Sequence, residues 1–200
     1  MDNKITAIIK FVLFILLLPV VAMATISFMS ELQTLPKDLT SAALAGILVF
    51  LVIHLFIYEL QPFYQYGQSL VASMFRFFPP LIKTMPFLLP VFSILFLVLF
   101  YFLTVVVTMK GIGNFLFFLS SFTLIMHLVF TAKTLREKDN NAVKPDYFFA
   151  MCIIYIAILS LIAFLLALIV KDFSFANFFI VTLAETAKIY QSLFEQLFVP

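Results

Sequence analysis

Residues 147–170 read YFFAMCIIYIAILSLIAFLLALIV, an apolar run that lies between Asp146 and Lys171 and contains no charged side chain. A bilayer core of about 30 Å is crossed by about 20 helical residues, because in lipid every backbone N–H and C=O must be satisfied within the segment. The run is long enough to cross the bilayer core, and it therefore predicts a transmembrane helix. Other charge-free intervals of similar length predict the remaining transmembrane helices in the same way.

Four further intervals of spanning length are free of charge, and they end at the pairs Lys10 and Glu31, Asp38 and Glu59, Lys83 and Lys110, and Lys110 and Lys133. The sequence therefore predicts an all-α integral membrane protein with about five transmembrane helices in a single membrane domain, 1–200. The predicted spans are 11–30, 41–60, 85–108, 112–132 and 147–170. Pro86 and Pro90 predict a kink near the start of the third span, and Pro19 predicts one in the first.

The composition agrees with a membrane protein. The chain is 64% hydrophobic and 11% charged, with a mean hydropathy of +1.19. Soluble domains average about 45–50% apolar and about 25% charged residues, so this class is excluded. The net charge of +2 is too small to indicate a nucleic-acid partner. The single cysteine, Cys152, has no partner for an internal disulfide.

The distribution of Lys and Arg predicts the orientation, because cytoplasmic loops carry an excess of both. With a cytoplasmic N-terminus, that side receives Lys4, Lys10, Arg76, Lys83, Lys133, Arg136, Lys138 and Lys144. The opposite side receives only Lys37, Lys110, Lys171 and Lys188. We therefore expect the inner (cytoplasmic) membrane, with the N-terminus inside and the C-terminus outside.

Two more segments are amphipathic, and each predicts a helix that does not cross. In 63–78 the apolar positions are Phe63, Tyr66, Leu70, Met74 and Phe77, and Pro79-Pro80 is expected to stop this helix. In 175–198 a polar stripe consists of Glu185, Lys188, Ser192 and Glu195. Its apolar side consists of Phe179, Leu183, Ile189, Tyr190, Leu193, Phe194 and Leu197. Such helices lie on a membrane surface or pack against a partner subunit.

Ionisable groups within spans are functional candidates, because they are costly there. His54 and His127 fall at similar depth in the second and fourth spans, so they are candidates for binding haem iron, or a metal together with Glu59. The alternative is a neutral histidine hydrogen-bonded to a neighbouring helix. We favour the alternative, and expect neither haem nor a metal.

Glu59 is the only candidate catalytic residue, and it ends the second span. We favour a structural role for its carboxylate, which can reach the interface or pair with Arg76 or Lys83. Ser120 and Ser121 precede His127, but a nucleophile needs a base and a third orienting group, and the sequence offers no such set.

Three segments resemble the site-2-protease-like (M50-type) membrane metallopeptidases of bacteria: MPFLLPVF at 85–92, MHLVFT at 126–131, and YFFA at 147–150. The resemblance implies a helical membrane fold with a zinc motif, His-Glu-x-x-His. The nearest segment here is YELQP at 58–62, in which both histidines are missing. Without them Glu59 has no zinc-bound water to deprotonate, so the resemblance implies an inactive relative.

The sequence as a whole favours a non-catalytic polytopic membrane protein, a scaffold or accessory subunit that binds lipid and other membrane subunits. Two alternatives stay open. One is a divergent membrane peptidase that uses Glu59, His54 and His127, and the other is a haem-binding protein or small-solute carrier built on the two histidines.

Overall fold

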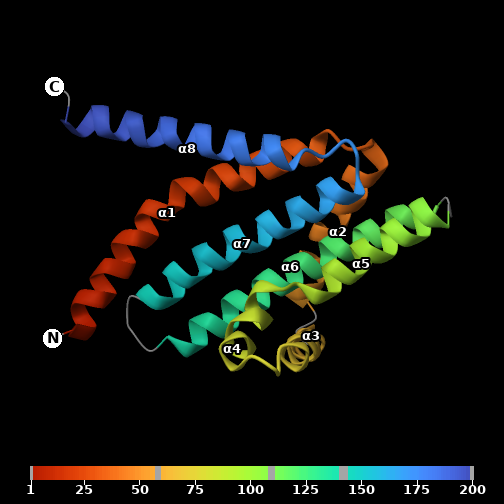
Figure 1. The fold of residues 1–200 in the computed structure, drawn as a ribbon, viewed down its shortest axis with the longest axis horizontal. Coiled ribbons are helices and arrows are strands. Elements are labelled where there is room, and N and C mark those ends of the chain that lie inside the picture. Colours follow the sequence, from red (N-terminus) through yellow and green to blue (C-terminus); the bar gives the residue numbers. More distant parts are fainter. Residues whose placement is uncertain (1, 57–59, 108–110, 140–143, 199–200) are drawn as a thin grey trace. The chain divides into compact units, whose positions relative to one another are not determined.

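The computed structural model describes residues 2–56, 60–107, 111–139 and 144–198, and these residues form helices and no strand. Figure 1 shows their order along the chain. The elements are α1 (Asp2–Gln33), α2 (Lys37–Phe56), α3 (Gln61–Met74), α4 (Pro79–Leu88), α5 (Val91–Tyr101), the π-helical segment η2 (Phe102–Val106), α6 (Ile112–Lys138), α7 (Pro145–Ile169) and α8 (Phe175–Phe198). The predicted all-α class is confirmed.

Four of these helices are long and apolar enough to cross a membrane: Lys4–Gln33, Lys37–Phe56, Ile112–Lys138 and Pro145–Ile169. The helices Pro79–Leu88 and Val91–Thr104 qualify only as a pair, and they are bent by 68° at the break between them. The part of the chain that the structure describes thus holds four helices of spanning length, or five if the bent pair is one span. α8 is outside this set.

The described part of the predicted third span, 85–108, falls in this bent pair, and the kink expected near its start is larger than predicted. Leu89 adopts an extended backbone conformation, with φ of −105° and ψ of 104°, which is favoured for a residue before proline. Pro90 has no N–H to continue the helix. The kink expected from these residues is a complete break, because two prolines lie close to the same turn.

The amphipathic helix predicted over 63–78 is shorter than expected, and Pro79-Pro80 do not stop it. α3 ends at Met74, and the two prolines begin α4 instead. Proline is tolerated in the first turn of a helix, because the N–H groups of that turn have no helical acceptor. α2 ends at Phe56, and the predicted end of the second span, residues 57–59, lies outside the described residues.

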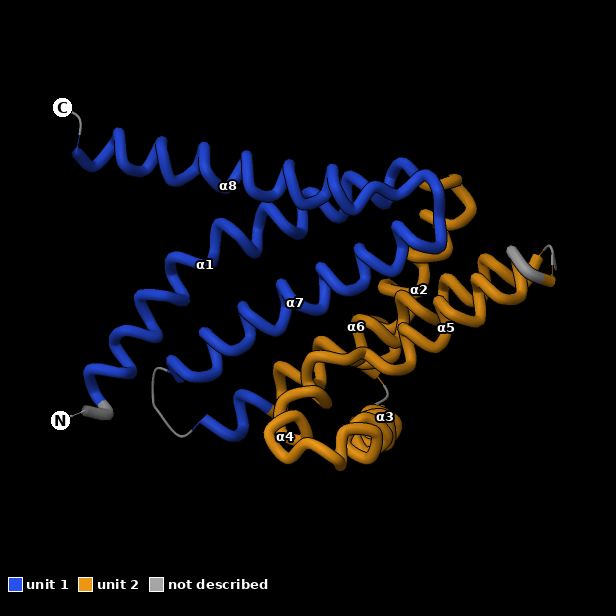
Figure 2. The backbone as a smooth tube through the Cα atoms, viewed as in Figure 1, with its two compact units in different colours: residues 1–34, 135–200 blue, residues 35–134 orange. Residues whose placement is uncertain are grey.

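The chain divides into two compact units, shown in blue and orange in Figure 2: unit 1 contains residues 1–34 and 135–200, and unit 2 contains residues 35–134. The predicted single domain stays a prediction. In unit 1, α1 contacts both α7 and α8. Pro19 lies inside α1, and Figure 1 shows this helix bending along its course. Lys10 forms an ion pair with Asp146 at 2.7 Å, which links α1 to the start of α7.

The packing of α1 differs between its two halves. Its second half buries Ala24, Ser27, Phe28, Glu31 and Leu32, whose spacing of three and four residues places them on one helical face. Its first half exposes large apolar side chains on all sides, at positions 5, 8, 9, 12, 13, 15, 16 and 18. The core of unit 1 therefore lies against the second half of α1.

Unit 2 is organised around α6. A Cβ at Gly46 of α2 would lie 2.4 Å from the Phe118 carbonyl oxygen of α6, so the two backbones approach as closely as only glycine permits. Next to this contact Phe50, Tyr64, Met126 and Phe130 form a buried cluster. The cluster joins α2, α3 and α6 into one core.

Candidate functional site

A polar stripe follows the buried face of α6. Ser120, Thr123, His127 and Thr131 are all buried and recur at intervals of three and four residues, so they lie on one face of the helix. Polar groups removed from water need hydrogen-bond partners. These partners come from α3, α4 and α5, so the stripe is the place where unit 2 gathers most of its buried polar chemistry.

The N-terminal part of the stripe, Ser120 and Thr123, contacts α5. The hydroxyls of Thr123 and Ser93 lie 3.0 Å apart, and Ser120 Oγ donates to the Ser93 carbonyl oxygen at 3.2 Å. Thr123 Oγ1 also lies 2.9 Å from the Leu119 carbonyl oxygen of its own helix. These hydroxyls satisfy one another and the backbone, which is the usual role of Ser and Thr between membrane helices.

His127 is the central residue of the stripe and is only 6% exposed. Its Nε2 lies 3.0 Å from the carbonyl oxygen of Phe87, in the last turn of α4. A carbonyl can only accept, so Nε2 is the donor in this hydrogen bond. Tyr64 packs edge-on against the ring, with centroids 5.5 Å apart. His127 thus ties α6 to the helix that precedes the break.

Tyr64 completes the stripe from α3. Its hydroxyl lies 3.0 Å from Thr131 Oγ1 and accepts a hydrogen bond from Gln68 Nε2. Burial raises the pKa of the Tyr64 hydroxyl above its ordinary value of 10.0, and the hydrogen bond to Thr131 opposes the shift. The group therefore stays protonated through the physiological range. Lys133 adds a second link to α3, since its Nζ donates to Gln61 Oε1 at 2.9 Å.

His54 belongs to the neighbouring aromatic cluster of unit 2. Its ring stacks on Phe50 and meets Phe130 edge-on, with centroids 5.5 Å apart in both pairs. Phe130 in turn stacks on Tyr64, which contacts His127. Both candidate histidines are thus built into one packed core. The described residues contain no group of three or more His, Cys, Asp or Glu side chains able to hold a metal, and Glu59 lies outside the described residues.

A small cavity adjoins His127, and its lining includes Tyr64, Gly67, Phe92 and Thr123. Its volume of about 10 Å³ is close to the minimum that admits one water molecule. Sites for organic ligands occupy about 300–1,000 Å³. The cavity as it stands therefore accommodates nothing larger than water.

Unit 1 contains a buried carboxylate, Glu31, which ends one of the charge-free intervals of the sequence. Glu31 is 4% exposed. It accepts hydrogen bonds from Ser174 N at 3.0 Å and from Asn177 Nδ2, at the start of α8. Thr34 Oγ1 donates to the Asp172 carbonyl oxygen at 2.7 Å in the same loop. A negative group at a helix N-terminus is favourable, so Glu31 anchors α8 to the end of α1.

The chemistry available in these two places is hydrogen bonding between helices. His127 Nε2 is bonded to a carbonyl oxygen, and the hydroxyls of the stripe are bonded to one another or to the backbone. A nucleophilic site would need a hydroxyl or thiol within reach of a base that a third group orients. No family model matches this chain, and neither a curated protein nor a solved structure matches it.

Proposed function

We propose that this chain is an integral protein of the inner membrane and acts as a non-catalytic scaffold or accessory subunit. The observation that supports it is the surface of α1. The most apolar part of this helix has a mean hydropathy of 2.7, and none of it is buried. A helix that is apolar all round is stable only when lipid or another protein surrounds it. The exposed first half of α1 thus provides the surface for lipid or a neighbouring membrane subunit.

The buried polar groups support a structural role as well. Glu31, Tyr64 and His127 each hold one helix to another. A carrier or enzyme of this size would be expected to direct some of its buried polar groups toward a site of ligand size. The resemblance to M50-type peptidases and the haem alternative stay predictions beside this proposal.

The orientation is tested by cysteine labelling in a Cys152→Ala background, because Cys152 is the only native thiol. We expect Lys37→Cys and Ser192→Cys to react with an impermeant reagent from outside the cell, and Lys138→Cys to be protected. The reverse pattern would contradict the proposed topology. Extraction of the protein from membranes by alkaline carbonate would contradict integral insertion itself.

The scaffold role is tested by photocrosslinking in intact membranes. A crosslinker at Ile8, which is exposed on α1, should yield adducts of discrete mass with other membrane proteins, whereas one at the buried Ala24 should not. Adducts at neither position would remove the support for a subunit role.

The two alternative functions have their own tests. Stoichiometric zinc in the purified protein, together with substrate cleavage that is lost in Glu59→Gln, would show a peptidase instead of a scaffold. A Soret band that is present in the wild type and lost in both His54→Ala and His127→Ala would show a haem protein instead of a scaffold.

A further inference from the structure

Helix α3 presents three different faces along its length. The face toward the core of unit 2 carries Tyr64, Gly67 and Val71, which are buried. A second face carries the polar residues Gln65, Ser69 and Ser73. The third face is apolar and exposed, and its residues are Phe63, Tyr66, Leu70 and Met74. Phe63 stacks on Phe92 of α5, with ring centroids 4.1 Å apart, whereas Tyr66 and Met74 are the most exposed residues of the stripe. The packing of α3 within the unit therefore leaves most of this apolar stripe exposed.

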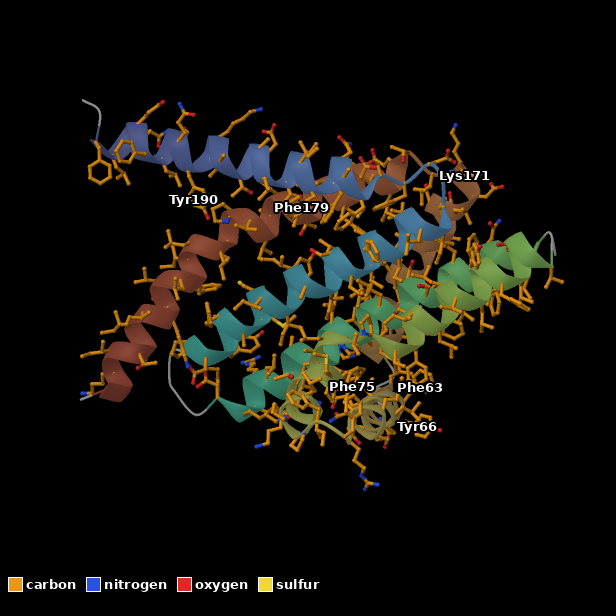
Figure 3. All side chains as sticks on the ribbon, in the orientation of Figure 1. Phe63, Tyr66, Phe75, Lys171, Phe179 and Tyr190 are labelled. Carbon is orange, nitrogen blue, oxygen red and sulfur yellow. The ribbon has the colours of Figure 1, made fainter. Side chains whose placement is uncertain are left out.

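The exposed stripe continues into the turn before α4. Phe77 is 80% exposed, and Phe78 beside it is also exposed. Figure 3 labels Phe63, Tyr66 and Phe75 around α3. Bulky aromatic side chains in such a row are typical of segments that enter the interfacial region of a bilayer, where the rings meet lipid and the backbone remains near the headgroups.

The charges of this region have one sign. α3, the turn 75–78 and α4 together contain Arg76 and Lys83 and no acidic residue, and Glu59, which precedes α3 in the sequence, lies outside the described residues. Both side chains are exposed, and neither forms an ion pair with any residue that the structure describes. Arg76 lies in the turn 75–78, between α3 and α4, and Lys83 lies in α4. Guanidinium and ammonium groups next to a membrane-inserting surface attract anionic headgroups, and arginine can bind a phosphate with two hydrogen bonds.

We propose that α3, the turn 75–78 and α4 form a binding site for anionic phospholipid. Arg76 and Lys83 contact headgroup phosphates, while Tyr66, Met74 and Phe77 lie against the glycerol and acyl chains. This inference rests on the proposed membrane location. It adds a preference for negatively charged lipid, which membrane insertion alone does not require.

Helix α8 provides an internal comparison. It also exposes an apolar face, which includes Phe179, Leu183 and Phe194. Its polar stripe, however, holds two glutamates and one lysine, and Lys188 is paired with Glu185 at 2.6 Å. A stripe with a net negative charge has no electrostatic attraction to anionic lipid. The preference should therefore belong to the α3–α4 region alone.

The test compares full-length variants in mixed micelles that contain either phosphatidylglycerol or phosphatidylcholine, with bound lipid counted by native mass spectrometry. The wild-type chain should bind phosphatidylglycerol more tightly. R76Q/K83Q should lose this preference by about 30-fold, since each cation near an anionic surface contributes about 1 kcal/mol. The control K171Q/K188Q carries the same charge change at two exposed lysines and should bind as the wild type does.

Two further measurements distinguish a site for anionic lipid from a site for free phosphate. Raising the salt concentration should weaken binding of phosphatidylglycerol to the wild type, because exposed charges are screened. Inorganic phosphate at the same concentration as the lipid should not displace it, and displacement would show a phosphate site instead of a lipid site. Equal binding of the two lipids by the wild type, or an equal loss in K171Q/K188Q, would overturn the inference. Carbonate extraction of the protein would instead overturn the proposed function.

Discussion

Helix α3 of unit 2 and helix α8 of unit 1 have the same three kinds of face, but they are held to their units in different ways. α3 is fixed along its length, by Gln61 at its start, Tyr64 in its first turns and Gly67 and Val71 beyond. α8 is fixed mainly by its N-terminal half, through Glu31 and the buried Phe178, Thr182 and Thr186. From residue 191 to 198 every α8 residue is exposed.

The difference indicates that an amphipathic pattern predicts a helix at an interface but not how firmly it is attached. The attachment depends on a third face, which touches the protein. In α3 this face combines close packing with buried hydrogen bonds. In α8 its last member, Thr186, has a buried hydroxyl with no hydrogen-bond partner among the described residues, and only Tyr190 reaches back to the Leu16 carbonyl beyond it.

The largest expected difference between the two helices follows from leucine substitutions on them. A Cβ at Gly67 would lie 2.7 Å from Phe92 Cε2 and 3.2 Å from Val91 Cγ1, so Gly67→Leu must displace these side chains of α5. Overpacking of this kind costs about 1–3 kcal/mol or more. Ala187→Leu on an exposed part of α8 should change stability by less than about 0.5 kcal/mol. Thermal unfolding in detergent, followed by circular dichroism, measures both, and equal effects would contradict the comparison.

The next largest effect is expected at the anchor of α8. Glu31→Ala leaves Ser174 N and Asn177 Nδ2 without their carboxylate acceptor, and the loss of such bonds costs about 1–3 kcal/mol. Hydrogen exchange at residues 174–178 should accelerate, while exchange in α3 should not change. Glu185→Ala removes an exposed carboxylate in an i,i+3 pair and serves as the control, with an expected cost below about 0.5 kcal/mol. Slow exchange at 174–178 in Glu31→Ala would show that α8 is held by packing alone.

A tyrosine pair tests the same contrast at the level of single hydroxyls. Tyr64→Phe leaves Thr131 and Gln68 without a partner in the core, so we expect a loss of about 1–2 kcal/mol. Tyr190→Phe removes a bond to the Leu16 carbonyl oxygen. Leu16 lies inside α1, where a carbonyl oxygen also accepts the helical hydrogen bond, so we expect a smaller loss. Chemical denaturation of the two variants against the wild type measures the difference. A larger loss for Tyr190→Phe would mean that α8 depends on its C-terminal half after all.

The smallest expected effect is a dependence of stability on high pH. Because burial raises the pKa of Tyr64, the folded state binds this proton more tightly than the unfolded state does. The contribution of this proton to the free energy of unfolding is therefore fully present below about pH 10, the pKa of an exposed tyrosine. It is lost as the pH rises through the folded-state pKa of Tyr64. Tyrosinate absorbance is titrated for the wild type and for Tyr64→Phe. The difference between the two curves should show one hydroxyl that ionises above pH 10. A difference curve centred at or below pH 10 would contradict the burial effect.

Particular residues show which parts of the candidate site had a signal in the sequence and which had none. His127 was a candidate because ionisable residues are rare within spans, and the structure shows it bonded to the Phe87 carbonyl oxygen. Thr123 and Thr131 were missed, although their spacing of four residues on either side of His127 was a visible signal. Glu31 was missed because a carboxylate at the end of an apolar interval is usually in water, and only the return of the chain at Ser174 buries it.

The sequence by itself determined the helical class and the positions of the four helices long enough to cross a membrane, because charge and hydropathy act locally and a backbone in lipid must satisfy its own hydrogen bonds. Only the tertiary structure decided which side of each helix is covered. Two of the three faces of α3 and α8 are visible as polar and apolar stripes, but the third is defined by a partner helix. Pro79-Pro80 illustrate the same limit, since a proline pair ends one helix or begins another according to what precedes it. Contacts between residues far apart in the chain, such as Tyr64 with Thr131 and Glu31 with Ser174, have no local signature, because they depend on how helices pack.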